Sequence, residues 1–225
     1  AGNTVVAKPA EQTSLIALRT IEIMHECGLP QGVVEAVIAR GSKVGQNIVP
    51  DLRIQAIMFT GSTETGSWIS QKLAERGGDP VPLIAETGGQ NCMVVDSTAL
   101  PEQVVDDVIA SGFQSAGQRC SALRVLFIQE EVADKVITMI KGAMQELHVG
   151  DPAYLSTDVG PVIDEKALGA LNEHVDYLKA RATLHYACSG PELDTGIGEN
   201  EHNFFVPRLY EISDLSVLTK EVFGP

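Results

Sequence analysis

Short apolar segments alternate with helix-like segments along most of the chain, and this alternation constrains the fold more than any other feature of the sequence. Consecutive parallel strands need a crossover connection, which is usually a helix, whereas antiparallel strands can be joined by a tight turn. The alternation therefore predicts an α/β fold, in which a parallel sheet carries helices on its faces. The segments expected to form strands are residues 4–7, 33–38, 54–60, 81–85, 91–95 and 124–128.

The helix-like segments carry apolar residues at helical spacing. The first begins near Glu11 and ends at Gly28-Leu29-Pro30, because glycine followed by proline is a typical helix exit. Residues 189–203 are rich in glycine and acids, and we expect them to form a surface loop between strands. Further helices are expected over residues 41–49, 61–76, 133–147 and 164–180.

Another helix is expected to begin at Pro101, since proline is favoured in the first turn. We interpret its apolar face as part of the core and not as a cofactor-binding surface. That face is expected to contain Val105, Val108, Ile109, Gly112, Phe113 and Ala116.

The composition excludes several classes of function. The chain has 225 residues and a formal net charge of −14 at pH 7, so its surface would repel nucleic-acid phosphates. No apolar run reaches the roughly 18–20 residues that span a bilayer. The first residues lack the pattern of a signal peptide, so we expect a cytoplasmic protein whose chain begins here partway through a fold.

The cysteines and histidines do not form a metal-binding or disulfide pattern. The five histidines do not cluster with acids at the spacing of metal ligands, and the cysteines show no paired spacing. We therefore expect no metal site, and free thiols in a reducing compartment. The four cysteines are Cys27, Cys92, Cys120 and Cys188.

Cys120 is the candidate nucleophile. It lies in Gly117-Gln118-Arg119-Cys120-Ser121, where the glycine and the small residues Ser121 and Ala122 leave room around the sulfur. Arg119 supplies an adjacent cation that favours the thiolate, which is the reactive form. The alternative is a buried structural cysteine, which is the commoner role of this residue. That alternative suits the other three cysteines better, because Cys120 follows a loop instead of lying on an apolar face.

Glu86 is the candidate general base. It ends the apolar segment 81–85 and precedes Thr87-Gly88-Gly89. In a parallel sheet, this position delivers a side chain to the crevice at the carboxyl ends of the strands. We expect Glu86 to be partly buried there and to accept a proton from water; the alternative is an acid that caps the next element.

The Gly88-Gly89 pair lies between two strands and is the expected domain hinge.

Two further segments could bind a nucleotide. Residues 61–66 place Gly61, Ser62 and Gly66 between a strand and a helix, where glycines and unpaired N–H groups suit a pyrophosphate. The alternative is a glycine turn in which Ser62 caps the helix. Lys8 and Glu11 follow the first strand and could both hydrogen-bond ribose hydroxyls, with the acid favouring NAD over NADP. The alternative is a surface lysine beside a helix-start glutamate.

Five segments in this order resemble the motifs of the aldehyde dehydrogenase superfamily. The resemblance covers nearly all of the chain, although Thr87 stands where leucine is more frequent. It implies a partial Rossmann-like NAD-binding domain over residues 1–88 and a partial catalytic domain over residues 89–225. The segments are Lys8-Pro9-Ala10-Glu11-Gln12-Thr13, Phe59-Thr60-Gly61-Ser62-Thr63 with Gly66, Glu86-Thr87-Gly88-Gly89, Gly117-Gln118-Arg119-Cys120 and Glu221-Val222-Phe223-Gly224-Pro225.

The resemblance implies a role for each motif. Cys120 would be the nucleophile, and Glu86 would activate the water that hydrolyses its thioester. The Cys120 N–H would supply half of an oxyanion hole, whose other donor would be an asparagine upstream of Ala1. Ser121 is expected to contribute to the substrate site. The residues expected to bind NAD are Lys8, Glu11, Gly61, Ser62, Gly66, Glu221 and Phe223.

Within the superfamily, residues 85–91, 118–124 and 158–164 are most similar to glutamate-semialdehyde (pyrroline-5-carboxylate) dehydrogenases. They resemble in particular the version fused to an FAD-dependent proline dehydrogenase in bacterial bifunctional proline utilization A. This implies NAD-dependent oxidation of L-glutamate γ-semialdehyde to L-glutamate, the second step of proline catabolism, in a homo-oligomeric parent. The chain would be about half of that dehydrogenase, and we expect it to lack useful activity alone and to expose apolar surface.

Two alternatives remain open. A dehydrogenase for another semialdehyde, such as succinate semialdehyde, would share the mechanism and differ in substrate. A nucleotide-binding or structural module would leave Cys120 idle, and its four thiols would react with alkylating reagents equally slowly.

Overall fold

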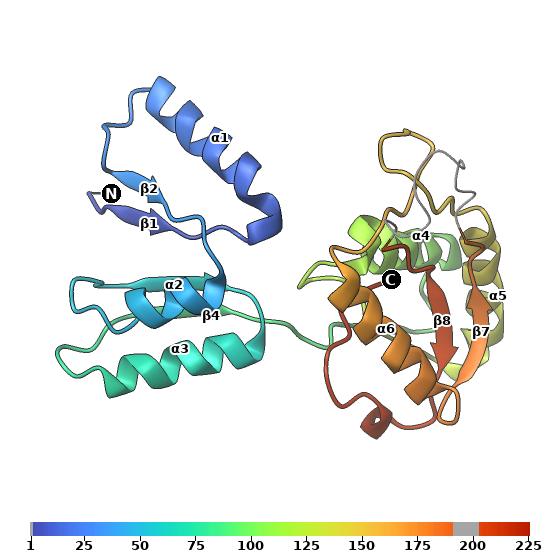
Figure 1. The fold of residues 1–225 in the computed structure, drawn as a ribbon. Helices are drawn as coiled ribbons and strands as arrows, with labels where there is room; N and C mark the ends of the chain where they lie inside the picture. Colours follow the sequence, from blue (N-terminus) through green and yellow to red (C-terminus); the bar gives the residue numbers. More distant parts are fainter. Residues whose placement is uncertain (1, 191–202) are drawn as a thin grey trace. The chain divides into compact units, whose positions relative to one another are not determined.

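The computed structural model describes residues 2–190 and 203–225. The chain divides into two compact units, one that ends at Thr87 and one that begins at Gly88 (Figure 1). Each unit is described by itself. The division lies beside the glycine pair expected to form a hinge, while the functional roles assigned to the two parts stay predictions.

The first unit contains two pairs of parallel strands. Strand β1 pairs with β2 through the register Val5↔Val34, and β3 pairs with β4 through the register Thr60↔Glu86. Helix α1 follows a short 3-10 turn and lies along the β1–β2 pair (Figure 1). In chain order the elements are β1 Val5–Ala7, α1 Ser14–Glu26, β2 Val34–Ala36, α2 Gly41–Ile48, β3 Ile57–Thr60, α3 Thr63–Glu75 and β4 Leu83–Glu86.

The second unit contains the larger core. Strands β5 and β6 pair in parallel, and helix α4 packs against α5 beside them. Ile140 and Met144 of α5 are completely buried in this core. In chain order the elements are β5 Cys92–Val95, α4 Pro101–Phe113, β6 Val125–Ile128, α5 Glu130–Gln145, α6 Glu165–Leu178, β7 Thr183–Ala187 and β8 Arg208–Glu211, with 3-10 turns at Gln114–Gly117 and Leu215–Val217.

The α/β class predicted from the sequence is confirmed, with two corrections. Strands β7 and β8 pair antiparallel, so a purely parallel arrangement does not describe the second unit. Helix α4 ends at Phe113, and Ala116 lies in the following 3-10 turn instead of on the helix face. Most of the loop expected over residues 189–203 lies outside the described residues.

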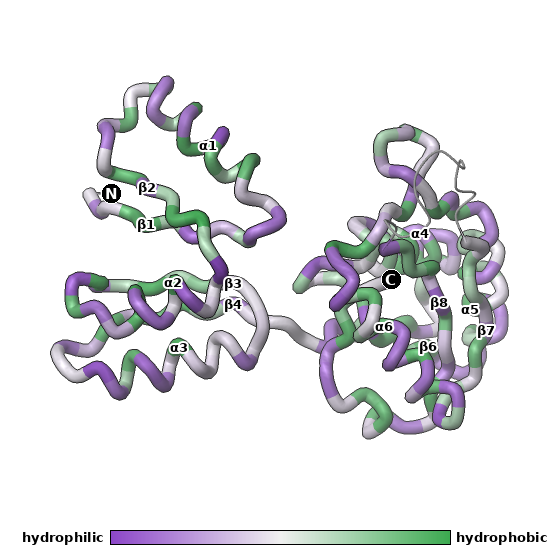
Figure 2. Tube along the Cα trace, viewed as in Figure 1, coloured by the Kyte–Doolittle hydropathy of each residue, from purple (hydrophilic) through white to green (hydrophobic). Residues whose placement is uncertain are grey.

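Each parallel strand pair carries apolar side chains on a face that is open to solvent. Met58 is 80% exposed and lies opposite Ile84 in the β3–β4 pair, and Val94 is 75% exposed and lies opposite Phe127 in the β5–β6 pair. Figure 2 shows strand β1 coloured as hydrophobic, and its residues Val5 and Val6 are also exposed. Parallel strands are normally covered on both faces. The apolar exposure expected from the sequence is therefore present in the described residues.

Candidate functional site

Cys120 lies in an exposed turn between the 3-10 turn Gln114–Gly117 and strand β6. Asn91, which precedes β5, fixes the backbone of this turn. Its side-chain amide donates hydrogen bonds to the carbonyl oxygens of Cys120 at 2.7 Å and Ala122 at 2.9 Å. The Cys120 N–H donates no hydrogen bond to any described residue. The thiol is therefore accessible, and an N–H donor beside it is free to bind an oxyanion.

Three consecutive residues before the nucleophile have left-handed backbone conformations. Their φ angles are +56° at Ser115, +52° at Ala116 and +62° at Gly117. This conformation costs a residue with a side chain roughly 1–2 kcal/mol, so surrounding contacts must hold it. The Arg119 Nε donates to Ser115 Oγ at 3.0 Å, and Ala116 is buried. Helix α4 therefore ends at Phe113, and the prediction that Ala116 continues its apolar face is wrong.

The segment Glu221–Pro225 packs against the nucleophile turn. A Cβ atom on Gly117 would collide with the Gly224 carbonyl group and lie 2.8 Å from the Pro225 nitrogen. A Cβ atom on Gly88 would lie 2.8 Å from the Glu221 carboxyl carbon. The second unit thus brings the carboxyl-terminal motif together with the nucleophile motif and with Gly88 of the third motif.

We expect Gly117→Ala to lower the local free energy of unfolding around strand β6 by about 2–4 kcal/mol. The added methyl group would meet the backbone of Gly224 and Pro225, and alanine disfavours the positive φ of +62°. Native-state hydrogen exchange of the amides in β6 measures this change.

Gly142→Ala is the matched control for that substitution. Gly142 lies inside helix α5, and a Cβ atom there meets nothing within 4 Å. It should stabilise the helix by about 0.5–1 kcal/mol. Equal effects of the two substitutions would show that the close packing at Gly117 is not a constraint.

Arg124 joins the two packed segments. Its guanidinium donates to the Gly224 carbonyl at 3.0 Å and to the Arg119 carbonyl at 3.2 Å, and it lies 3.5 Å from a Glu221 carboxylate oxygen. It also lies over the ring of Phe223, 5.4 Å from the centroid. Burial lowers the pKa of Arg124, and the nearby Glu221 carboxylate opposes that shift. Arg124, four residues after Cys120, therefore helps to hold Glu221 and Phe223 in position.

Glu86 ends strand β4 in the first unit. The Gly61 N–H donates to the Glu86 carbonyl at 3.1 Å, which places the glycine turn at the carboxyl end of the neighbouring strand β3. Gly66 is buried, and a Cβ atom there would lie 3.2 Å from the Thr87 methyl group. The expectation that Glu86 is partly buried is wrong, because its side chain is exposed. Its carboxylate is open to water, and Cys120 belongs to the other unit.

Ser62 caps helix α3, as expected if residues 61–66 form a glycine turn at the start of a helix. Its hydroxyl oxygen accepts a hydrogen bond from the Thr65 N–H at 3.2 Å. The cap leaves other N–H groups of the first helical turn available, so it is compatible with anion binding at the same turn.

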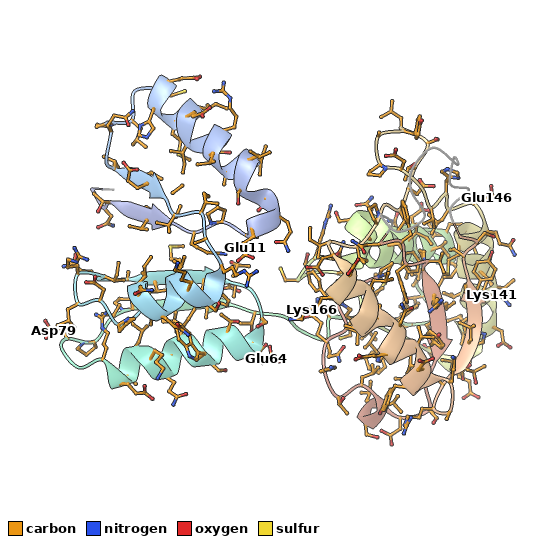
Figure 3. All side chains as sticks on the ribbon, viewed as in Figure 1. Glu11, Glu64, Asp79, Lys141, Glu146 and Lys166 are labelled. Atoms are coloured by element: carbon orange, nitrogen blue, oxygen red, sulfur yellow. The ribbon has the colours of Figure 1, made fainter. Side chains whose placement is uncertain are left out.

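Lys8 and Glu11 lie together after strand β1. The Lys8 ammonium is 3.6 Å from the Glu11 carboxylate, and that carboxylate accepts a hydrogen bond at 2.9 Å from the Gly41 N–H, at the start of helix α2. Figure 3 labels Glu11, which lies between strand β1 and helix α1. A Cβ atom added to Gly41 would make only ordinary van der Waals contacts with the Lys8 side chain, 3.6 Å from its Nζ. A cationic donor and a carboxylate acceptor thus lie side by side, which is the pair that a vicinal diol requires.

Three of the four cysteines are exposed. Cys27, Cys92 and Cys120 are free and exposed, and Cys188 is free and buried. The interpretation of Cys27 and Cys92 as buried structural residues is therefore wrong. The spacing of apolar residues in the sequence did not reveal that both side chains are exposed. Cys188 fits that interpretation, and its thiol lies 3.2 Å from the Met144 carbonyl.

Burial raises the pKa of Cys188 from an ordinary value of 9.0 to about 11. We therefore expect Cys188 to resist alkylation at pH 8 in the folded protein while Cys27 reacts. The unfolded thiol loses its proton at a lower pH than the folded one, so the free energy of unfolding should fall as pH rises from 9.0 toward 11. Cys188→Ala should lack this part of the pH dependence. Equal labelling of Cys188 and Cys27 at pH 8 would contradict the assignment.

Residues 2–190 and 203–225 contain no group of three histidine, cysteine or acidic side chains that could hold a metal ion. The same residues include no helix with the length and apolar character needed to cross a membrane.

Sequence reasoning missed the roles of Asn91 and Arg124. Both lie within the quoted motifs, since Asn91 follows the glycine pair and Arg124 lies four residues after Cys120. The available signal was a polar residue directly before an apolar strand: Asn91 before residues 92–95, and Arg124 before residues 125–128. Ser121 is exposed next to Cys120, and its part in substrate binding stays a prediction.

The comparisons with known proteins agree on one family. The aldehyde dehydrogenase family model matches residues 1–225. The bifunctional protein PutA of Salmonella typhimurium is 47% identical over all of this chain, and 1-pyrroline-5-carboxylate dehydrogenase of Geobacillus kaustophilus is 34% identical over all of it. The crystal structure of a proline utilization A mutant from Bradyrhizobium japonicum superposes with a TM-score of 0.92 at 48% identity, over the whole chain and 22% of that protein.

The chain spans 17% of the Salmonella protein and 43% of the Geobacillus protein. The family model nevertheless covers every residue, and the relatives match from end to end of this chain. The chain therefore belongs to the aldehyde dehydrogenase family.

Proposed function

We propose that the polypeptide containing this chain oxidises L-glutamate γ-semialdehyde to L-glutamate through a thioester on Cys120, with NAD as the hydride acceptor. The observation that carries this proposal is the exposed Cys120 thiol in a turn held by Asn91. Its support from relatives is the match to proteins named PutA and 1-pyrroline-5-carboxylate dehydrogenase.

Cys120 forms the covalent bond to the substrate. Its thiolate attacks the aldehyde carbon, and the carbonyl oxygen becomes an oxyanion in the resulting tetrahedral adduct. The unengaged Cys120 N–H is one donor for that oxyanion. The chemistry that NAD⁺ supplies when bound is acceptance of a hydride, which converts the adduct into a thioester.

Glu86 releases the product. Its exposed carboxylate accepts a proton from water, and the resulting hydroxide attacks the thioester carbon. The carbon–sulfur bond then breaks, the acid leaves, and Cys120 returns to the thiolate. The polar, open position of Glu86 at the end of strand β4 suits a base that must meet water.

The residues of the first unit fit a dinucleotide. The Lys8 ammonium and Glu11 carboxylate offer a donor and an acceptor to the ribose hydroxyls, and the negative charge of Glu11 disfavours a 2′-phosphate. The turn from Gly61 to Gly66 opens helix α3, whose first N–H groups and dipole suit a pyrophosphate. In the second unit, Glu221 and Phe223 are the proposed contacts of the nicotinamide ribose.

Several properties of the parent polypeptide belong to the same proposal. Residues 1–88 would be part of its NAD-binding domain and residues 89–225 part of its catalytic domain, with Ser121 near the substrate. The parent would be cytoplasmic and homo-oligomeric and would carry a fused FAD-dependent proline dehydrogenase. The isolated chain would lack useful turnover. Its apolar strand faces, which are open to solvent, would be covered in the parent.

The test is NADH formation by the longest natural polypeptide that contains this chain. Glutamate semialdehyde, succinate semialdehyde and acetaldehyde are compared at equal concentration, with NAD⁺ and NADP⁺ in parallel. A strong preference for glutamate semialdehyde with NAD⁺ supports the proposal. Preference for another aldehyde would keep the mechanism and overturn the substrate, and no NADH from any aldehyde would favour a non-catalytic module.

A further inference from the structure

Arg124 is the most heavily engaged charged residue near Cys120. Its side chain is only 7% exposed, and Glu221, its ionic partner, is 18% exposed. One guanidinium nitrogen donates to the Gly224 carbonyl, and the other donates to the Arg119 carbonyl and faces the Glu221 carboxylate. A single planar group therefore contacts the residue before the nucleophile and three residues of the carboxyl-terminal segment, Glu221, Phe223 and Gly224.

Burying the Arg124 guanidinium costs free energy of solvation, and the ion pair with Glu221 is not expected to return a net gain in stability. The Arg124 Nε is buried and has no hydrogen-bond partner among the described residues. Burial also lowers the pKa of the guanidinium. Buried ion pairs are often no more stable than apolar groups of similar volume. What an apolar side chain could not supply is a rigid fork that bonds several oxygens at fixed angles.

The contacts of Arg124 form a short path to the sulfur. A ligand that binds Glu221 competes with Arg124 for the same carboxylate. The other guanidinium bond ends on the Arg119 carbonyl, which belongs to the peptide that carries the Cys120 N–H. Asn91 holds the Cys120 carbonyl on the other side, so the peptide has few ways to move independently. These contacts connect the Glu221 carboxylate to the peptide that carries the Cys120 N–H.

We propose that Arg124 is a positioning residue that couples occupancy of Glu221 to the reactivity of the Cys120 thiol. The proposal rests on the proposed function, in which Glu221 contacts the nicotinamide ribose. Through Arg124, binding of the cofactor adjusts the turn that presents the nucleophile.

The test measures alkylation of Cys120 by iodoacetamide in the longest natural polypeptide, with and without NAD⁺, using the exposed Cys27 as internal reference. In the unsubstituted protein NAD⁺ should change the Cys120 rate by a factor within the range of about 5–150 that is typical of coupled sites. Arg124→Lys keeps the charge but loses the fork, so NAD⁺ should change the rate less than about 2-fold. The KM for NAD⁺ should rise while the KM for the aldehyde stays unchanged.

Arg208→Lys is the matched control. Arg208 begins strand β8, stacks on Phe205 with 4.6 Å to the ring centroid, and also has a buried nitrogen without a partner among the described residues. Among the described residues, no hydrogen bond or ion pair joins Arg208 to Glu221 or to the turn that carries Cys120. Arg208→Lys should therefore keep the effect of NAD⁺ on Cys120 alkylation, even if the protein unfolds at a lower temperature.

The outcomes separate this inference from the proposed function. If NADH forms but Arg124→Lys retains the full NAD⁺ effect, the coupling is wrong and the dehydrogenase proposal stands. If no aldehyde yields NADH, the proposed function fails, and loss of the NAD⁺ effect in Arg124→Lys alone still supports the coupling. Absence of any NAD⁺ effect in the unsubstituted protein, or equal loss in both arginine variants, would overturn it.

Discussion

Replacement of Cys120 by alanine should reduce NADH formation by the parent polypeptide by at least about 10³-fold, because no other group can form the thioester. Cys120 is exposed in a turn whose backbone is fixed by Asn91, so the substitution removes the sulfur with little change in packing. Steady-state absorbance of NADH with glutamate semialdehyde measures the loss. The affinity for NAD⁺, measured by calorimetry, should change little.

Cys92→Ala is the control for this substitution. Cys92 is also a free, exposed cysteine of the second unit, and it lies on strand β5 instead of in the nucleophile turn. We expect this variant to retain the activity of the unsubstituted protein. Substantial turnover by Cys120→Ala, or an equal loss in both variants, would contradict the assignment of the nucleophile.

Replacement of Glu86 by glutamine should lower kcat by about 10²–10⁴-fold while the first turnover remains fast. Glutamine has nearly the same shape but cannot accept a proton from water, so hydrolysis of the thioester is slowed more than its formation. Stopped-flow measurement should therefore show a burst of NADH that approaches one equivalent per Cys120. The burst is then followed by slow turnover.

Glu35→Gln provides the comparison. Glu35 is an exposed glutamate on strand β2 of the same unit, and its replacement should leave both phases unchanged. Loss of the burst together with steady-state activity in Glu86→Gln would indicate that Glu86 acts before the thioester forms. Normal kcat in that variant would remove Glu86 from the mechanism.

The sequence predicted the parallel strands well because their signals are local. Strands Ile57–Thr60 and Val125–Ile128 lie within the predicted apolar segments 54–60 and 124–128, and segments with helical spacing fill the intervals between strands. Strands β7 and β8 were harder to recognise because twenty residues separate them and they pair antiparallel. Their pairing depends on long-range contacts that no short window of sequence contains.

Ala116 illustrates how tertiary contacts override a local pattern. It continues the apolar spacing of helix α4, yet it adopts a left-handed conformation. At the next residue, Gly117, any side chain would collide with Gly224, which lies over one hundred residues away in the sequence. Helical periodicity carries no information about that partner.

The site shows the same division between local and distant information. The motifs identified Cys120, Glu86 and Glu221 as candidates, since their residue types and glycine-rich settings are local properties. The link from Arg124 to Glu221 spans 97 residues, and only the folded chain brings the two together. The exposure of Glu86 was likewise missed, because position at a strand end does not determine what covers it.

The most direct test of the central claim is identification of the covalent intermediate in the Glu86→Gln variant of the parent polypeptide. The variant is mixed with glutamate semialdehyde and NAD⁺, quenched in acid during the burst, and digested for peptide mass analysis. We expect a glutamyl thioester on the peptide that contains Cys120 and on no other cysteine peptide. A burst of NADH with an unmodified Cys120 peptide, or an acyl group on Cys27, Cys92 or Cys188, would contradict it.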